Sequence, residues 1–239
     1  PRTRAFEIRL KGMMPGSVIH YTLDGNEPTS KAAIYTQPIK VTKDTQVKAV
    51  VFKNGAQVGK VTQKSFFVNK ATGKSTSSNV AYRFKPDNPG AKDYSEFNFC
   101  GLTNGIRGYL NHVHPWVAFK PAQYTEIIVD LDTITSFRKI RYGVMNGYGQ
   151  EAVAPESVDI EISNDSISFK RIASKKFTYT ISNKWQMFEQ KFNFEPQKAR
   201  YVKLRFKNGK LPHKLGGFPV PEKREGELGL LFIDEIEIK

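Results

Sequence analysis

Cysteine, histidine and long apolar runs are all scarce in this sequence. Its single cysteine, Cys100, excludes an intrachain disulfide, and the neighbouring Phe97 and Phe99 favour a small buried apolar role for it. No apolar run reaches the roughly 18 residues of a transmembrane helix, so no membrane span is expected. No signal-peptide pattern is found either. The four histidines are too few and too dispersed to predict a zinc site, which requires three or four ligands.

Acidic residues are also in deficit. The 239 residues include 37 Lys and Arg but only 23 Asp and Glu, which gives a formal net charge of +14. This excess suits an acidic partner such as nucleic acid, an anionic glycan or a membrane surface. The basic residues are scattered along the sequence, however, which favours a soluble basic surface without a dedicated acidic ligand.

No stretch shows a sustained helical period, whereas period-two alternation is found almost throughout. Asn54-Gly55 between two alternating runs is a strong hairpin signal. Many short strands with turns between them predict an all-β protein of sandwiches or jelly rolls, and they exclude a (β/α)₈ barrel. The expected strands are residues 6–10, 18–23, 47–52, 61–68, 127–131, 140–144, 158–162, 201–206 and 231–238.

A polar stretch rich in Ser, Thr and Gly, residues 69–79, predicts a domain boundary. We therefore expect two domains, residues 1–70 and 81–239, joined by a linker at 71–80. Long segments that do not alternate lie only in the second domain, and such loops on a β scaffold usually carry binding residues. These segments are residues 103–119, 145–156 and 207–229.

The first domain has a specific motif, "IHYTLDGNEPTSKAAIYTQPIKVTKDTQVKAVVFKNG". It resembles the small fibronectin-III-like domain that follows the catalytic barrel in bacterial chitobiases and related β-hexosaminidases. The resemblance covers roughly residues 5–68 and implies an immunoglobulin/fibronectin-III-like sandwich that serves as a spacer. The residues that carry it are Tyr21, Thr22, Asp24, Gly25, Pro28, Thr29, Tyr35, Pro38, Ile39, Lys48 and Ala49.

The second domain has several motifs that are similar to discoidin modules, also known as coagulation factor type C domains. They are "LTNGIRG", "DLDTITSFRKIRYG", "VDIEISNDSISFKRI", "ARYVKLRFKN" and "FIDEIEI". The resemblance implies a discoidin-like β-sandwich jelly roll of the kind called a family 32 carbohydrate-binding module in bacterial glycosidases. The chain departs from the family pattern at Asn104, where Asp is usual, at Ser166, where Gly is usual, and in lacking a Trp shortly before "FIDEI".

The order of spacer and discoidin module resembles the C-terminal region of family 20 glycoside hydrolases. This resemblance implies a non-catalytic fragment of a bacterial β-N-acetylhexosaminidase, in which the catalytic barrel of the parent chain is a partner. It further implies a glycan ligand containing N-acetylhexosamine or galactose, and a periplasmic, outer-membrane-attached or secreted location. Two alternatives stay open. One is a protein- or cell-surface-interaction module without sugar affinity, and the other is a basic module that binds anionic glycans or nucleic acid, although nucleic acid is not a partner that we expect.

Catalysis by this chain is not expected. A hexosaminidase of that family uses an adjacent Asp-Glu pair, and the only such pair here is Asp234-Glu235. We expect this pair to lie within a strand, where successive side chains point to opposite faces and do not converge on one sugar.

Sugar binding requires a flat aromatic face and polar side chains that bond the hydroxyls. Tyr148, which is flanked by two glycines, is the preferred stacking residue. The full set of predicted carbohydrate-binding residues is Tyr148, His112, His213, Trp116, Asn146 and Phe218. The discoidin resemblance also implies a structural calcium ion between the first loop and the last strand, with Asn104 and Glu235 as its ligands; no other cofactor is expected.

Overall fold

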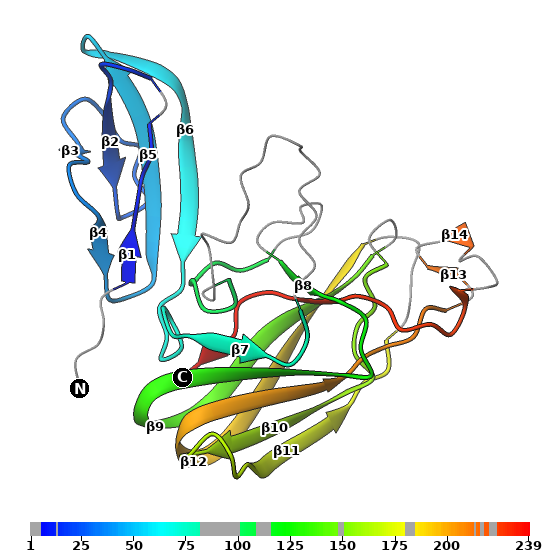
Figure 1. Ribbon diagram of the computed structural model, residues 1–239. Helices are drawn as coiled ribbons and strands as arrows, with labels where there is room; N and C mark the ends of the chain where they lie inside the picture. The colour runs from blue at the N-terminus through cyan, green and yellow to red at the C-terminus, as the bar shows by residue number, and fades with distance from the viewer. Residues whose placement is uncertain are drawn as a thin grey trace.

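The computed structural model describes residues 6–12, 14–81, 101–108, 116–147, 151–179, 185–212, 214–215, 218–219 and 224–239 (Figure 1). Sixteen strands and no α-helix are found in these ranges, as expected for an all-β protein. Within them, accordingly, no helix has the length and apolarity to cross a membrane.

The first domain contains two antiparallel sheets. A pair of short strands forms one, and four strands in the order β3-β2-β5-β6 form the other. A cluster of apolar residues from the two sheets is buried and includes Ile8, Ile39, Val47 and Phe66. The strands are β1 (Phe6–Ile8), β2 (Val18–Thr22), β3 (Ala33–Ile34), β4 (Ile39–Val41), β5 (Thr45–Lys53) and β6 (Ala56–Phe66).

The hairpin between β5 and β6 follows the turn chemistry that the sequence predicts. Asn54 and Gly55 both have positive φ, 50° and 78°, and Lys53 pairs with Ala56. Positive φ at both central residues defines a type I′ turn, whose twist matches that of the strands. The predicted hairpin is therefore confirmed.

The second domain is built on an eight-stranded sheet with the order β11-β10-β12-β9-β15-β8, in which β7 and β16 also pair with β9. Two further short strands form a separate hairpin. The strands are β7 (Thr76–Ser78), β8 (Val117–Phe119), β9 (Tyr124–Asn146), β10 (Ser157–Ser163), β11 (Lys170–Lys176), β12 (Gln186–Lys207), β13 (Lys214–Leu215), β14 (Phe218–Pro219), β15 (Leu231–Ile233) and β16 (Glu237–Ile238).

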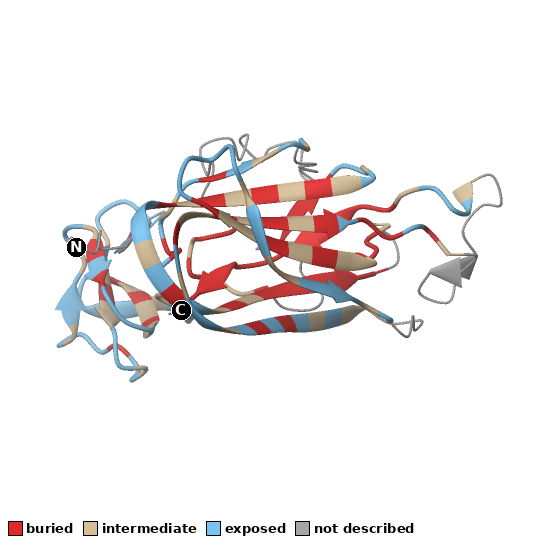
Figure 2. Ribbon diagram, turned by 90° about the horizontal axis from the view of Figure 1, so that it is seen from below, coloured by how far each residue is buried: buried red, intermediate tan, exposed pale blue. Residues whose placement is uncertain are grey.

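Two unusually long strands, β9 and β12, turn this sheet into a sandwich. Both curve sharply near the C-terminus of the chain (Figure 1), where their pairing shifts register and Asp132 adopts a φ of 66°. Ile127 and Val129 precede the bend, Ile140 and Val144 follow it, and all four belong to one buried cluster. The two halves of the sheet therefore face each other across a shared core, and buried residues alternate with exposed ones along the strands (Figure 2).

Residues 71–80, predicted as a linker, instead form part of the second domain. Ala71 is fully buried in its core, and β7 pairs with residues 127–129 of β9. A short edge strand needs main-chain hydrogen bonds rather than large apolar side chains, which is why its sequence is polar. The predicted closing strand 231–238 is likewise divided, because residues 234–236 lie between β15 and β16 outside any strand.

The chain passes from one domain to the other without a free segment. The Phe67 N–H donates to the Gly105 carbonyl at 2.7 Å, and the Val68 N–H donates to the Asp44 carboxylate at 2.8 Å. Ile106, from the second domain, packs against the buried cluster of the first. Direct contacts therefore join the domains on both sides of residue 67.

The β10–β11 turn provides a test of local strain. Ser166 has a φ of 63°, a conformation that disfavours side chains with a Cβ, and its side chain is exposed. We expect Ser166→Gly to raise the free energy of unfolding by about 0.5–1 kcal/mol, measured by urea denaturation. Ser75→Gly is the matched control at an exposed position without positive φ, and it should lower stability. A loss of stability in both variants would contradict the strain.

Candidate functional site

An aromatic cluster is formed by residues that are far apart in the sequence. Trp116 is buried together with Met145, Ala152 and Phe232, and Trp185 packs against this cluster while staying partly exposed. Trp116 and Trp185 directly follow segments 109–115 and 180–184, which lie outside the described residues, and Ala152 comes shortly after a third such segment, 148–150. Residues from three separate parts of the chain therefore pack around Trp116 and Trp185.

Glycines make this packing close. A Cβ on Gly147 would overlap the Trp185 indole, and a Cβ on Gly108 would overlap the Trp116 indole. Because overlaps of this size cannot be relieved by small shifts of a packed ring, both positions require glycine. Trp185 consequently packs closely against the β9 backbone at Gly147, and the residue stays partly exposed.

A charged pair completes the site. The Arg224 guanidinium donates two hydrogen bonds to the Glu151 carboxylate and a third to Glu227 at 2.9 Å. These carboxylates raise the pKa of Arg224 above its ordinary value. Glu151 is held next to the buried cluster by its main chain. Its carbonyl accepts the N–H of Leu230, a member of the cluster, at 2.9 Å. We call the group Trp185, Gly147, Trp116, Glu151 and Arg224 the loop-end site.

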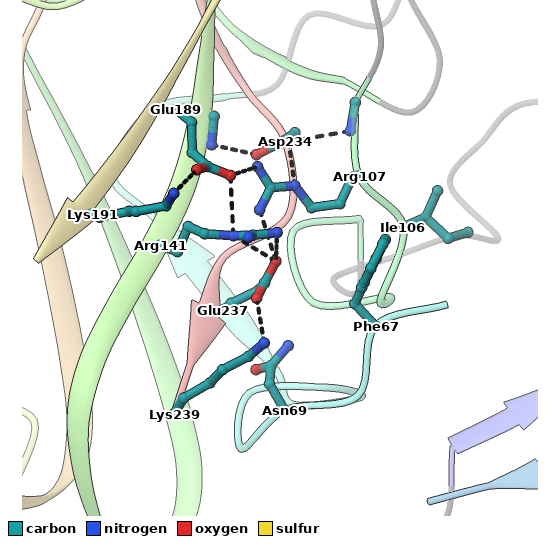
Figure 3. A network of polar contacts seen from close by, with 12 residues as sticks. Phe67, Asn69, Ile106, Arg107, Arg141, Glu189, Lys191, Asp234, Glu237 and Lys239 are labelled. Atoms are coloured by element: carbon teal, nitrogen blue, oxygen red, sulfur yellow. Dashed lines mark hydrogen bonds and ion pairs between the residues drawn. The ribbon is translucent and has the colours of Figure 1, made fainter. Parts of the chain in front are cut away.

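A buried ionic network positions the segment that leads into this site (Figure 3). Arg107 contacts three carboxylates: Asp234 at 3.2 Å, Glu237 at 2.7 Å and Glu189 at 3.0 Å. Arg141 contacts two of the same carboxylates, Glu189 at 3.3 Å and Glu237 at 2.6 Å. The segment 101–108 is thereby joined to β9, β12 and the end of the chain.

Asp234 is the most deeply buried member of the network. Besides Arg107, its carboxylate accepts the main-chain N–H groups of Gly108, at 3.1 Å, and Gly143. Burial raises the pKa of Asp234, and Arg107 only partly opposes this. Burial would also raise the pKa of Glu237, but hydrogen bonds and charges from Arg107, Lys239 and Arg141 lower it on balance.

Removing the central cation should uncouple the network. Arg107→Met keeps most of the side-chain volume but leaves the buried Asp234 without its cation and removes one of the three cations around Glu237. We expect a loss of about 3–5 kcal/mol in the free energy of unfolding. The control is Arg200→Met, whose partner Asp130 and own side chain are both partly exposed; it should cost less than about 1 kcal/mol. Equal losses in the two variants, measured by urea denaturation, would contradict a special role for Arg107.

Glu235 is the residue that best fits the expected calcium ion. It is fully buried, and no hydrogen bond of regular geometry reaches either carboxylate oxygen. Burial raises its pKa well above the ordinary value, although the Gly105 N–H and the Asn69 amide lower it in part. An uncompensated buried carboxylate either stays protonated or takes up a cation.

The other oxygens nearby are largely engaged. Asn104 accepts the N–H of Ile106 at 2.9 Å, and the carbonyls of Leu102, Thr103 and Gly105 each accept a main-chain N–H. The described residues contain no group of three or more His, Cys, Asp or Glu suited to a metal. Since calcium requires six to eight oxygens, this donor set fits at most a weak site, and calcium binding stays a prediction.

Replacing Glu235 by Gln separates the two possibilities. A carboxyl whose pKa is raised by folding stabilises the protein below its unfolded pKa, and this contribution is lost as the pH rises from there toward the folded pKa. Without metal, Glu235→Gln should match the wild type near pH 4 and be more stable at pH 8, the difference growing by up to about 1.4 kcal/mol per pH unit. A variant less stable than the wild type at pH 8 in a chelator would contradict the burial of an uncompensated acid. With a calcium site, added calcium raises the melting temperature of the wild type only.

The predicted carbohydrate-binding residues have different outcomes. Tyr148, His112 and His213 lie outside the described residues, as does the Phe218 side chain, so their roles stay predictions. Trp116 is only 6% exposed, and it belongs to the buried cluster against which Trp185 packs. Asn146 is buried too, and its side-chain oxygen accepts the Ala154 N–H, which fixes the chain beyond β9.

Sequence reasoning missed Trp185 and Arg107. Trp185 follows the short sequence "ISNK", which is not among the long segments that the sequence analysis singled out. The scarcity of tryptophan is the one signal that could have identified it, because the sequence contains only two. Arg107 gave no signal, since its partners lie 82 to 130 residues away along the sequence.

Fold and site together define an all-β protein with two sandwich domains, the second of which carries a loop-end aromatic cluster. The model of the F5/8 type C domain matches residues 91–215, and that of the Fn3 associated domain matches residues 8–66. The chain belongs to the F5/8 type C domain family. No curated protein sequence matches it.

Solved structures with a similar fold include several sugar-binding modules. The chitosan-binding module 1 of a chitosanase/glucanase from Paenibacillus sp. IK-5 has 15% identity and a TM-score of 0.43, over 72% of this chain and 98% of that chain. CpGH89CBM32-6 from Clostridium perfringens has 15% identity and a TM-score of 0.40, over 72% and 98%. The lectin domain of lectinolysin, complexed with Lewis B antigen, has 16% identity and a TM-score of 0.42, over 72% and 96%. A likeness of this degree identifies no ligand for this chain.

Proposed function

We propose that the second domain is a glycan-binding module and that the loop-end site is its binding surface. The proposal rests on Trp185, a partly exposed residue whose indole packs closely against Gly147 and the buried cluster around Trp116. A fixed aromatic face is what the C–H face of a sugar ring stacks on. Because the ring is already held in place, little side-chain entropy is lost on binding.

The polar part of such a site is also at hand. Arg224 and Glu151 form a charged pair next to Ala152, which belongs to the buried cluster that Trp185 packs against. Tyr148, His112 and His213 stay predicted members of the site. A neutral sugar with several hydroxyls, such as an N-acetylhexosamine or galactose unit, suits one aromatic face surrounded by donors and acceptors.

The module takes no part in catalysis. The only adjacent Asp-Glu pair of the sequence, Asp234-Glu235, is fully buried, and Asp234 is occupied by Arg107 and two main-chain N–H groups. The sequence analysis expected this pair within a strand; it lies between β15 and β16, but burial keeps it from a substrate all the same.

The first domain acts as a spacer, and the parent chain is a bacterial β-N-acetylhexosaminidase of glycoside hydrolase family 20. This part of the proposal is supported by the domain order and by the motifs around Asp24-Gly25 in the first domain. The catalytic barrel of that parent is then a partner, the location is periplasmic, outer-membrane-attached or secreted, and the glycan-binding module keeps the enzyme near its substrate.

A glycan array followed by affinity measurements tests the site. We expect the chain to bind neutral GlcNAc- or galactose-containing glycans with little dependence on salt. Trp185→Ala should weaken binding by about 1–3 kcal/mol, and Trp185→Tyr, which keeps a flat face and most of the packing, should retain most of it. Tyr201→Ala is the control, because Tyr201 is a partly exposed aromatic residue in the part of β12 that pairs with β10.

The outcomes distinguish the alternatives. Neutral glycan binding that survives Trp185→Ala would place the sugar elsewhere and overturn the loop-end site. No binding to any glycan would favour the protein- or cell-surface-interaction module instead.

A further inference from the structure

A cavity lies at the bend of β9, away from the loop-end site. It has a volume of about 480 Å³ and is lined by the residues that we call the basic pocket: Lys70, Arg138, Lys139, Lys239, Asn193 and Phe194. Lys139 and Asn146 occupy the same strand seven residues apart, which corresponds to about 23 Å. The basic pocket is therefore separate from the loop-end site.

Main-chain hydrogen bonds bring the four basic residues together. The Arg138 and Lys139 N–H groups donate to the Lys239 carbonyl at 2.8 and 3.0 Å, and the Lys239 N–H donates back to Lys139 at 2.9 Å. The Lys70 N–H donates to the carbonyl of Ile238 at 2.9 Å. The main chains of these four residues are therefore held together at one place in the fold.

Most of this charge is uncompensated. Lys239 contacts Glu237 at 3.0 Å, but the side chains of Lys70, Arg138 and Lys139 have no ion pair with any described acidic residue, and no acidic side chain lines the pocket. Three cations of β12 differ: Lys203, Arg205 and Lys207 are paired with Glu161, Glu126 and Glu156. Grouped cations without acidic partners attract an anion.

The uncharged walls of the pocket restrict what that anion is attached to. Phe194 is partly exposed, and its ring is fixed edge-to-face against Phe137 at 6.4 Å. Asn193, opposite Lys139 on the neighbouring strand, is exposed and supplies an amide. An apolar wall, an amide and several cations together suit a hydroxylated ring that carries a sulfate or carboxylate group.

We infer that the basic pocket binds an acidic sugar unit of a polysaccharide through its sulfate or carboxylate. A cavity of about 480 Å³ is within the range of roughly 300–1,000 Å³ that holds a small ligand. Nucleic acid, by contrast, is bound along an extended basic surface that neutralises many phosphates. This site is independent of the neutral-glycan site proposed above and does not rest on it.

The experiment compares two double variants of equal charge in the full chain. Arg138→Gln/Lys139→Gln removes two unpaired cations of the pocket, and Arg205→Gln/Lys207→Gln removes two paired cations of β12. The probes are a sulfated heparin hexasaccharide, a polyglucuronate hexasaccharide, neutral cellohexaose and single-stranded DNA. Affinity is measured at low and high salt, and melting temperatures establish that both variants fold.

We expect the wild type to bind the sulfated or the carboxylated probe but not cellohexaose, and the two charged probes distinguish sulfate from carboxylate. The pocket variant should lose at least tenfold in affinity and show a shallower salt dependence, whereas the β12 variant stays within about twofold.

Equal losses in both variants, or no binding of either charged hexasaccharide, would overturn the inference. Single-stranded DNA that binds as tightly through the same two residues would overturn the assignment to a sugar. Trp185→Ala should leave the binding of the acidic probes unchanged. Loss of acidic-probe binding in this variant would show that the two sites are not independent.

Discussion

The buried ion network around Arg107 is the interaction on which most of the second domain depends. A charge that is removed from water requires partners of opposite sign, and Arg107 obtains them from β12 and from both sides of the β15–β16 break. The same segment carries Ile106, which contacts the first domain, and Gly108, which leads toward the loop-end site. One arginine therefore couples the domain junction, the core sheet and the candidate binding surface.

The second domain presents different chemistry at its two ends. Near Asn146 and Gly147 an aromatic ring is backed by glycine, whereas near Lys139 the bend of β9 gathers cations without acidic partners. Both ends belong to one continuous strand, so the distance between them is set by the sheet. If both proposed sites bind, one polysaccharide with neutral and acidic units would contact the two ends of the domain together.

The sequence predicted those features that depend on local pattern. Alternation identified β2, β5 and β10, and Asn54-Gly55 identified a hairpin, because these signals act over a few residues. It did not predict β7, whose polar residues are held by main-chain pairing with β9, nor β11, a charged strand at the edge of the sheet. Nor did it predict the site residues Trp185 and Arg107, since the role of each depends on partners that only the tertiary fold brings near.

The short connection between β6 and β7 has a mechanical consequence. Under the proposed function, a pull between the two domains reaches the second domain first at residues 67–73, whose N–H groups bond to Gly105, Ile238 and Thr103, and then at residues 76–78 of β7. Their hydrogen bonds to β9 run across the strand direction, so a pull along β7 loads the three residue pairs simultaneously instead of opening them one after another. A three-residue strand arranged in this way resists drag better than its length suggests.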